Sequence, residues 1–130
     1  MDHHHEYPEL AAGLEQVKHN FRRYGLLDDQ VAFLEGWFID TLPTAPMSTI
    51  AVLRLDGDMY ESTMQALEPL YPKLSPGGYC IVDDYQLPNC RAAVDEHRAR
   101  LGINDELVPI DLASVYWRKS APAASAATAD

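Results

Sequence analysis

The sequence is poor in basic residues, in cysteines and in long apolar runs. It carries 10 Lys and Arg residues against 20 Asp and Glu residues, which gives a formal net charge of −10 at pH 7. Because binding to phosphate backbones requires clustered Lys and Arg, this balance argues against nucleic acid as a partner. Cys80 and Cys90 have neither metal-type nor disulfide-type spacing, so we expect two buried free thiols.

The absence of long apolar runs argues against a membrane location. No run approaches the roughly 18 residues that a membrane-spanning helix needs. The first six residues have no basic stretch followed by an apolar one, which argues against a secretory signal. The 130 residues allow one domain, and hydrophobic residues at 47% are typical of a globular protein. These observations predict a cytoplasmic protein without a membrane partner.

Apolar periodicity divides the chain into alternating helices and strands. Apolar residues at steps of three and four predict helices, whereas short apolar runs that end at Gly or Asp predict strands. The predicted helices cover 9–24, 60–71 and 90–101, and the predicted strands cover 31–34, 50–55, 79–82, 107–112 and 114–118. Pro69 should kink or shorten the second helix. We expect residues 1–118 to form the domain and residues 119–130 to form a disordered, Ala-rich tail.

Carboxylates follow two of the predicted strands. Asp56 comes directly after one strand, and Asp83 and Asp84 come directly after the next. Alternating strands and helices indicate an α/β fold with a mostly parallel sheet, in which ligands bind at the carboxyl ends of the strands. Carboxylates that converge there repel one another unless one keeps a proton or a hard cation such as Mg²⁺ lies among them. The alternative interpretation is that these aspartates cap the helices that follow.

The motif Asp56-Gly57-Asp58 also occurs in other protein classes. A strand followed by Asp-x-Asp is found in aspartyl-phosphate phosphatases and in metal-binding glycosyltransferases. The phosphatase pattern has Thr or Val two residues after the second Asp, where this chain has Tyr60. The motif alone therefore leaves an Asp-x-Asp metal enzyme as an alternative.

Two further features have both a functional and a structural interpretation. His3, His4 and His5 could bind a metal or a substrate, although a frayed terminus is the interpretation that we favour. Trp37 and Phe38 could stack on an adenine or pack in the core. The residues alone do not decide between these interpretations.

Several motifs resemble the macrocin O-methyltransferase family. The segments that carry the resemblance are Asn20–Asp28 (NFRRYGLLD), Phe33–Phe38 (FLEGWF), Asp40–Pro43 (DTLP), Leu53–Thr63 (LRLDGDMYEST), Gly77–Tyr85 (GGYCIVDDY), Gly102–Ile103 and Val115–Arg118 (VYWR). They run in order from about Tyr7 to Arg118. This is the family of sugar O-methyltransferases that act on macrolide and aminocoumarin antibiotics, and the resemblance is to its C-terminal portion.

The resemblance implies a reaction and a metal site. Family members transfer the methyl group of S-adenosylmethionine to a sugar hydroxyl, with Mg²⁺ holding the glycosylated acceptor. Carried over by position, the metal ligands are Asp56, Asp83 and Asp84, and Asp56 is also the catalytic residue that accepts the hydroxyl proton. This agrees with the chemistry, because a sugar hydroxyl is a poor nucleophile until a cation lowers its pKa and orients it.

The resemblance also implies positions for the donor and the acceptor. Glu35, Gly36 and Trp37 are similar to the family segment that lies beside the adenine of S-adenosylmethionine. On the acceptor side, the resemblance implies substrate contacts for His5 and Tyr85.

One departure from the family pattern affects the expected fold. The family holds the donor mainly with a Gly-rich turn after its first strand, and this sequence has no such turn after a predicted strand. We therefore expect an incomplete Rossmann-like class I methyltransferase sheet that lacks the first two strands and ends in an antiparallel hairpin. Unpaired strand edges would then favour a homo-oligomer or a complementing N-terminal segment. The functional hypotheses are a methyltransferase, a noncatalytic remnant or binding module, and an Asp-x-Asp metal enzyme.

Overall fold

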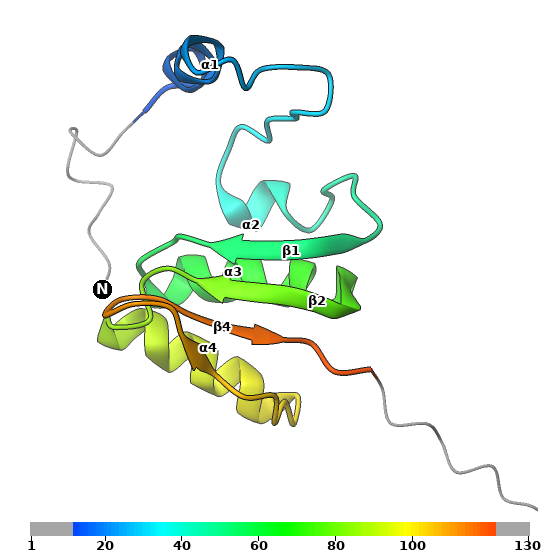
Figure 1. Cartoon of the computed structure of the whole chain (residues 1–130), viewed down its shortest axis with the longest axis vertical. Helices are drawn as coiled ribbons and strands as arrows, with labels where there is room; N and C mark the ends of the chain where they lie inside the picture. The colour runs from blue at the N-terminus through cyan, green and yellow to red at the C-terminus, as the bar shows by residue number, and fades with distance from the viewer. Residues whose placement is uncertain (1–11, 122–130) are drawn as a thin grey trace, which may run out of the picture.

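The computed structural model describes residues 12–121 and contains a four-stranded mixed sheet in the order β1-β2-β4-β3 (Figure 1). The elements are α1 (Leu14–Arg23), α2 (Phe38–Thr41), β1 (Ile50–Leu55), α3 (Tyr60–Leu70), the 3-10 helix η3 (Tyr71–Lys73), β2 (Leu74–Val82), α4 (Pro88–Arg100), β3 (Val108–Pro109) and β4 (Val115–Arg118). No helix in this range is long and apolar enough to cross a bilayer.

The sheet combines one parallel pair of strands with antiparallel pairs. β1 and β2 run parallel and are joined through α3, which is the βαβ unit that alternating strands and helices predict. β4 pairs antiparallel with β2 and with β3, so the predicted closing hairpin is confirmed. Because β4 reverses direction between β2 and β3, the described sheet is mixed rather than mostly parallel.

The core lies on one face of the sheet. Leu53 of β1, Cys80 of β2 and Trp117 of β4 are neighbours in register, and all three are buried. The same cluster contains Leu67 of α3 and Val94 of α4, so both helices pack on this face. Because strand side chains alternate between faces, this burial leaves the residues between them on the opposite face.

The opposite face is largely open. Val52, Arg54 and Tyr79 point to this side, and Val52 and Tyr79 are 55% and 42% exposed. Ile81 and Tyr116, which are also on this side, are half-buried. α1 does not close this face, since none of its residues is buried within the described range, and it lies away from the sheet (Figure 1). The sheet is therefore one-sided within residues 12–121.

Several predicted boundaries need correction. The predicted strand over 31–34 is wrong, because this segment has no β structure and pairs with none of the described strands. The predicted strand over 107–112 shortens to β3, and β2 begins at Leu74 rather than at Tyr79. β2 is longer because its register against β1 jumps from the Ile50–Leu74 pair to the Val52–Tyr79 pair, which accommodates the Pro-Gly-Gly turn as an irregularity inside the strand.

Gly78 makes this irregularity possible. A Cβ atom at this position would lie 2.7 Å from the Ala51 carbonyl oxygen and 2.9 Å from the Ser75 carbonyl oxygen. Both distances are shorter than real Cβ atoms show, so only glycine allows the two backbones to approach this closely.

The ends of the helices follow local rules. The predicted first helix is confirmed only from Leu14 to Arg23, and residues 1–11 lie outside the described part of the chain. α3 ends at Leu70, one residue after Pro69, as expected from a proline that cannot continue the backbone hydrogen bonding.

The chain stays attached to the sheet beyond β4. Lys119 donates its backbone N–H to the Gly78 carbonyl, and its own carbonyl accepts from Gly77. The sheet therefore holds Lys119, the first residue of the predicted tail. Residues 122–130 of that tail lie outside the described part of the chain.

Candidate metal centre

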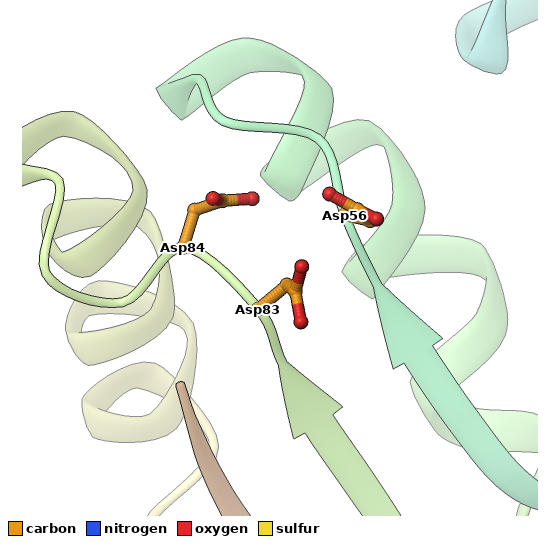
Figure 2. Close-up of side chains that lie close together, drawn as sticks. All are labelled: Asp56, Asp83 and Asp84. Carbon is orange, nitrogen blue, oxygen red and sulfur yellow. The ribbon is translucent and has the colours of Figure 1, made fainter. Parts of the chain in front are cut away.

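The aspartates that follow β1 and β2 come together at one edge of the sheet. Leu55 and Val82 are the last paired residues of the two parallel strands, so Asp56 and Asp83 leave the sheet side by side. One carboxylate oxygen from each of Asp56, Asp83 and Asp84 lies within 4.8 Å of the others. Figure 2 shows the three carboxylates around one space beyond the strand ends. This is the convergence that the sequence predicts.

The helix-capping interpretation of these aspartates is not supported. α3 begins after Met59 and α4 begins after Leu87, and neither N-cap has a side-chain hydrogen bond. The carboxylates are therefore left for another role.

Asp84 lies in an environment that disfavours its charged form and that a bound cation would stabilise. Its Oδ2 atom is buried and has no hydrogen-bond partner among the described residues. The pKa of Asp84 is raised to about 7, first by burial, then by a hydrogen bond with Asp58, and further by the charges of Asp56 and Asp83. A cation among these oxygens would replace the shared proton and remove the repulsion.

Asp83 is fixed from several directions. Its backbone N–H donates to the Leu55 carbonyl over 2.9 Å, which continues the pairing of β1 and β2 by one residue. The Ser114 hydroxyl donates to the Asp83 carbonyl over 2.9 Å and lies 3.5 Å from Asp83 Oδ1. Arg54 Nη2 lies 2.8 Å from Asp83 Oδ2 and Arg54 Nη1 lies 2.9 Å from Asp56 Oδ2. The sequence motifs assign neither Ser114 nor Arg54 to the site, because the contacts of both residues with Asp83 join segments that are far apart in the chain.

The turn after Asp56 is held by the Ser62 side chain. Asp58 has a φ of 59°, a left-handed conformation that Asp adopts more readily than most residues. The Ser62 hydroxyl donates to the Gly57 carbonyl and, over 3.4 Å, to the Met59 carbonyl. A Cβ atom on Gly57 would lie 3.1 Å from Ser62 Oγ. A Cβ atom at this distance would require the Ser62 side chain to shift by a few tenths of an ångström, which glycine avoids.

Tyr85 is bound to α4. Its hydroxyl donates to Asp95 Oδ1 over 2.7 Å, and the Arg91 guanidinium lies 5.0 Å from the ring centre. Burial and the hydrogen bond to Asp95 raise the pKa of Tyr85 to about 12. Its role in substrate binding stays a prediction, as does that of His5, which lies outside the described residues.

The predicted donor segment leads into α2. Trp37 is the N-cap residue of α2, and its side chain is exposed at 71% rather than packed in the core. Gly36 has a φ of 137°, and a Cβ atom there would lie 2.9 Å from Thr41 Cγ2, so the turn requires glycine. Glu35 is exposed beside it. The arrangement leaves the indole ring free to stack on a flat ligand.

A pocket of about 210 Å³ connects the region of α2 to the metal centre. Its walls are mainly apolar, from Phe38 and Leu42 on one side to Ala66 and Leu70 on the other, and Asp56 lies on its lining. Periodicity did not reveal this pocket, because the residues come from α2, β1 and α3 and meet only in the fold.

Comparisons with known proteins give a consistent result. The chain is 59% identical over 120 residues to mycinamicin III 3''-O-methyltransferase of Micromonospora griseorubida, covering 90% of this chain and 47% of that protein. It is 61% identical over 112 residues to demethyldecarbamoylnovobiocin O-methyltransferase of Streptomyces niveus, covering 85% of this chain and 43% of that protein. The chain spans about half the length of the curated relatives that it matches.

The structural comparison agrees. The O-methyltransferase NovP matches with a TM-score of 0.88 and 58% identity, over 91% of this chain and 49% of NovP. CalS11, a TDP-rhamnose 3'-O-methyltransferase of calicheamicin biosynthesis, matches with a TM-score of 0.57 and 27% identity, over 73% of this chain and 44% of CalS11. The family model for macrocin O-methyltransferase (TylF) matches residues 1–119. The chain therefore belongs to the macrocin O-methyltransferase family.

Proposed function

We propose that this chain forms the metal- and acceptor-binding part of an S-adenosylmethionine- and Mg²⁺-dependent O-methyltransferase that acts on a sugar hydroxyl of a natural product. The observation that carries the proposal is the convergence of Asp56, Asp83 and Asp84 within 4.8 Å, with a buried Asp84 oxygen that has no partner among the described residues. Two relatives have a sugar in their names, a rhamnosyl-tetracenomycin C 4'-O-methyltransferase and the TDP-rhamnose 3'-O-methyltransferase CalS11, and they support the substrate class.

The residues fit a hard divalent cation. Three carboxylates supply oxygen ligands and leave positions for water and a substrate oxygen, which is the usual arrangement for Mg²⁺. A bound Mg²⁺ would supply the Lewis acidity that lowers the pKa of the acceptor hydroxyl. Asp56, Asp83 and Asp84 would hold it.

The chain's own residues complete the proposed reaction. Asp56 lies where the pocket meets the metal centre, so it accepts the proton of the sugar hydroxyl. S-adenosylmethionine would supply the methyl group: as the hydroxyl oxygen bonds to the methyl carbon, S-adenosylhomocysteine would leave with the electron pair of the broken carbon–sulfur bond. Placing these atoms in line is the main contribution of a protein to such a transfer.

The donor has a partial site in the described residues. Trp37 offers an exposed ring for the adenine, with Gly36 and Glu35 at its base. None of the described strands is followed by a Gly-rich turn. The described sheet corresponds, in this proposal, to one half of a Rossmann-like class I methyltransferase sheet.

A noncatalytic binding module is the second candidate. The observation that favours it is that none of the described strands is followed by the Gly-rich turn with which the family holds the donor. Such a module would keep the metal site and bind a sugar without using the donor.

Calorimetry separates the two candidates. S-adenosylmethionine is titrated into the purified chain with and without Mg²⁺. Micromolar binding supports the methyltransferase, whereas metal binding without donor binding supports the module.

The metal site is tested with variants of matched charge. Asp83→Asn or Asp84→Asn should weaken Mg²⁺ binding by at least tenfold, whereas Asp95→Asn on α4 should not change it. Equal effects from all three variants would contradict the site.

A further inference from the structure

A single arginine joins two of the proposed metal ligands. Arg54 lies on β1, on the open face of the sheet, one residue before the strand ends. Its two terminal nitrogens contact aspartates that follow two different strands. Nη1 lies 2.9 Å from Asp56 Oδ2, and Nη2 lies 2.8 Å from Asp83 Oδ2. Because the guanidinium is planar and rigid, these contacts set the distance and orientation of the two carboxylates relative to each other.

The contacts leave ligand capacity on both aspartates. Arg54 takes the Oδ2 atom of each, and each carboxylate has a second oxygen, Oδ1. Asp83 Oδ1 has a hydroxyl contact at 3.5 Å, from Ser114, and that distance is at the limit of a hydrogen bond. The two Oδ1 atoms can therefore bind an ion while Arg54 keeps its contacts with the two Oδ2 atoms.

We infer that Arg54 is a positioning residue for the metal centre, holding Asp56 and Asp83 in the geometry that binds the ion. This inference rests on the proposed function. The positive charge of Arg54 also repels a cation, so two effects oppose each other. The Arg54 side chain is 52% exposed, so water screens both its charge and its two ion pairs. Two contacts from one planar group still restrict the relative orientation of the two carboxylates, and we expect this restriction to be the larger effect.

The structure supplies a matched control. Arg100 forms an ion pair with Glu68 at 3.0 Å, and its side chain is 49% exposed, close to the value for Arg54. That pair joins α4 to α3 away from the three aspartates. Since exposed ion pairs contribute little to stability, variants at both positions should fold.

The test compares the variants Arg54→Lys, Arg54→Gln and Arg100→Gln with the wild type. Each full chain is titrated with Mn²⁺, and the electron paramagnetic resonance signal of free Mn²⁺ measures how much metal remains unbound. Lysine keeps the positive charge but has one terminal nitrogen, so it cannot reproduce the two contacts of the planar guanidinium. Weaker binding by Arg54→Lys therefore isolates the geometric effect. We expect Arg54→Gln to bind Mn²⁺ about tenfold more weakly, Arg54→Lys to lie between it and the wild type, and Arg100→Gln to match the wild type.

The possible outcomes separate this inference from the proposed function. If the wild type binds Mn²⁺ and Arg54→Gln binds equally or more tightly, charge repulsion outweighs positioning and the inference is overturned, while the metal site stands. If the wild type does not bind Mn²⁺, both fail. If Arg54→Gln does not fold by circular dichroism, Arg54→Lys decides the question, because unchanged binding by that variant overturns the inference.

Discussion

We expect the carboxyl group of Asp84 to make metal binding depend on pH. Its pKa is raised to about 7, with burial as the main cause, so near neutral pH a metal must displace a proton from it. We expect the affinity for Mg²⁺ to fall below pH 7, by roughly tenfold per pH unit, and to level off above pH 8. Calorimetric titration with Mg²⁺ between pH 6 and pH 8.5 measures this. A flat profile would contradict the assignment of Asp84 as a ligand.

The same carboxyl group should destabilise the metal-free chain at high pH. Because its folded-state pKa is raised, the protonated form contributes stability below the unfolded-state value of about 4, and this stability is lost as the pH rises through about 7. Asp84→Asn should therefore increase the free energy of unfolding at pH 8 by about 1–2 kcal/mol and have little effect near pH 4. Urea titration in the presence of a chelator measures the difference.

A control for this prediction is Asp29→Asn, which changes an exposed carboxylate outside the elements of the sheet. It should leave the stability unchanged at both pH values. A destabilised Asp84→Asn variant at pH 8 would show that the carboxylate is satisfied in the folded chain.

At the residue scale, the sequence predicted which aspartates come together at the site, but it did not predict which other side chains contact them. The order of strands and aspartates was enough to bring Asp56, Asp83 and Asp84 together, because neighbouring parallel strands end at the same edge. The contact between Asp58 and Asp84 depends on a positive φ, and the bridge made by Arg54 depends on a rotamer. Neither is encoded in spacing.

Among the elements, α3 carries much of the core. Leu67 is fully buried against the sheet, and Leu101, just after α4, is 52% exposed. Leu67→Ala should lower the free energy of unfolding by about 3 kcal/mol, because it removes packed methyl groups and leaves a cavity. Leu101→Ala should cost less than about 1 kcal/mol. Urea unfolding followed by circular dichroism compares the two, and similar losses would contradict the packing described for α3.

His97 gives α4 a response to acid. Its ring is buried, neither ring nitrogen has a hydrogen-bond partner in the described structure, and it stacks edge-on against Tyr71 at 5.4 Å. Burial, followed by the charge of Arg100, lowers the pKa of His97. A lowered folded-state pKa means that stability is complete above the unfolded value of about 6.5 and is lost as the pH falls through the folded value.

The variant His97→Phe tests this response. It removes the titrating group and keeps a ring in the same space, so the free energy of unfolding should vary less between pH 7 and pH 5 than in the wild type. Urea unfolding at each pH gives the comparison. Parallel profiles for the two proteins would show that the acid response arises elsewhere.

The elements that the sequence predicted well are those whose partners are neighbours in the chain. α3 packs on β1 before it and on α4 after it, so local periodicity was sufficient. The segment 31–34 has the apolar composition of a strand, but a strand needs a hydrogen-bonding partner, and none of the described strands pairs with it. The start of β2 was missed because Pro76 and Gly78 signal a turn, and the fold accommodates that turn inside the strand.

At the scale of the whole molecule, the described residues cover one face of the sheet and leave the other largely open. β1 ends the described sheet, so one of its edges presents unpaired backbone groups next to the exposed Val52 side chain. Such an edge is a template for pairing with a second copy. We expect concentration-dependent self-association, measured by sedimentation velocity, and Val52→Lys should reduce it. Leu112→Lys, at an exposed residue between β3 and β4, should have no effect. Association that both variants weaken equally would point to a general apolar effect.

Two cysteines in the core provide a natural probe of transient opening. Cys80 and Cys90 are both fully buried free thiols, and burial raises the pKa of Cys80 to about 12. A cysteine reacts with a disulfide reagent only as a thiolate that the reagent can reach, so the native chain should react slowly with such reagents even under oxidising conditions. Because Cys80 lies in the sheet and Cys90 lies in α4, the two labelling rates would report separately on strand separation and on helix detachment. The two native cysteines would therefore report the rates of local opening in the sheet and in α4 without an engineered label.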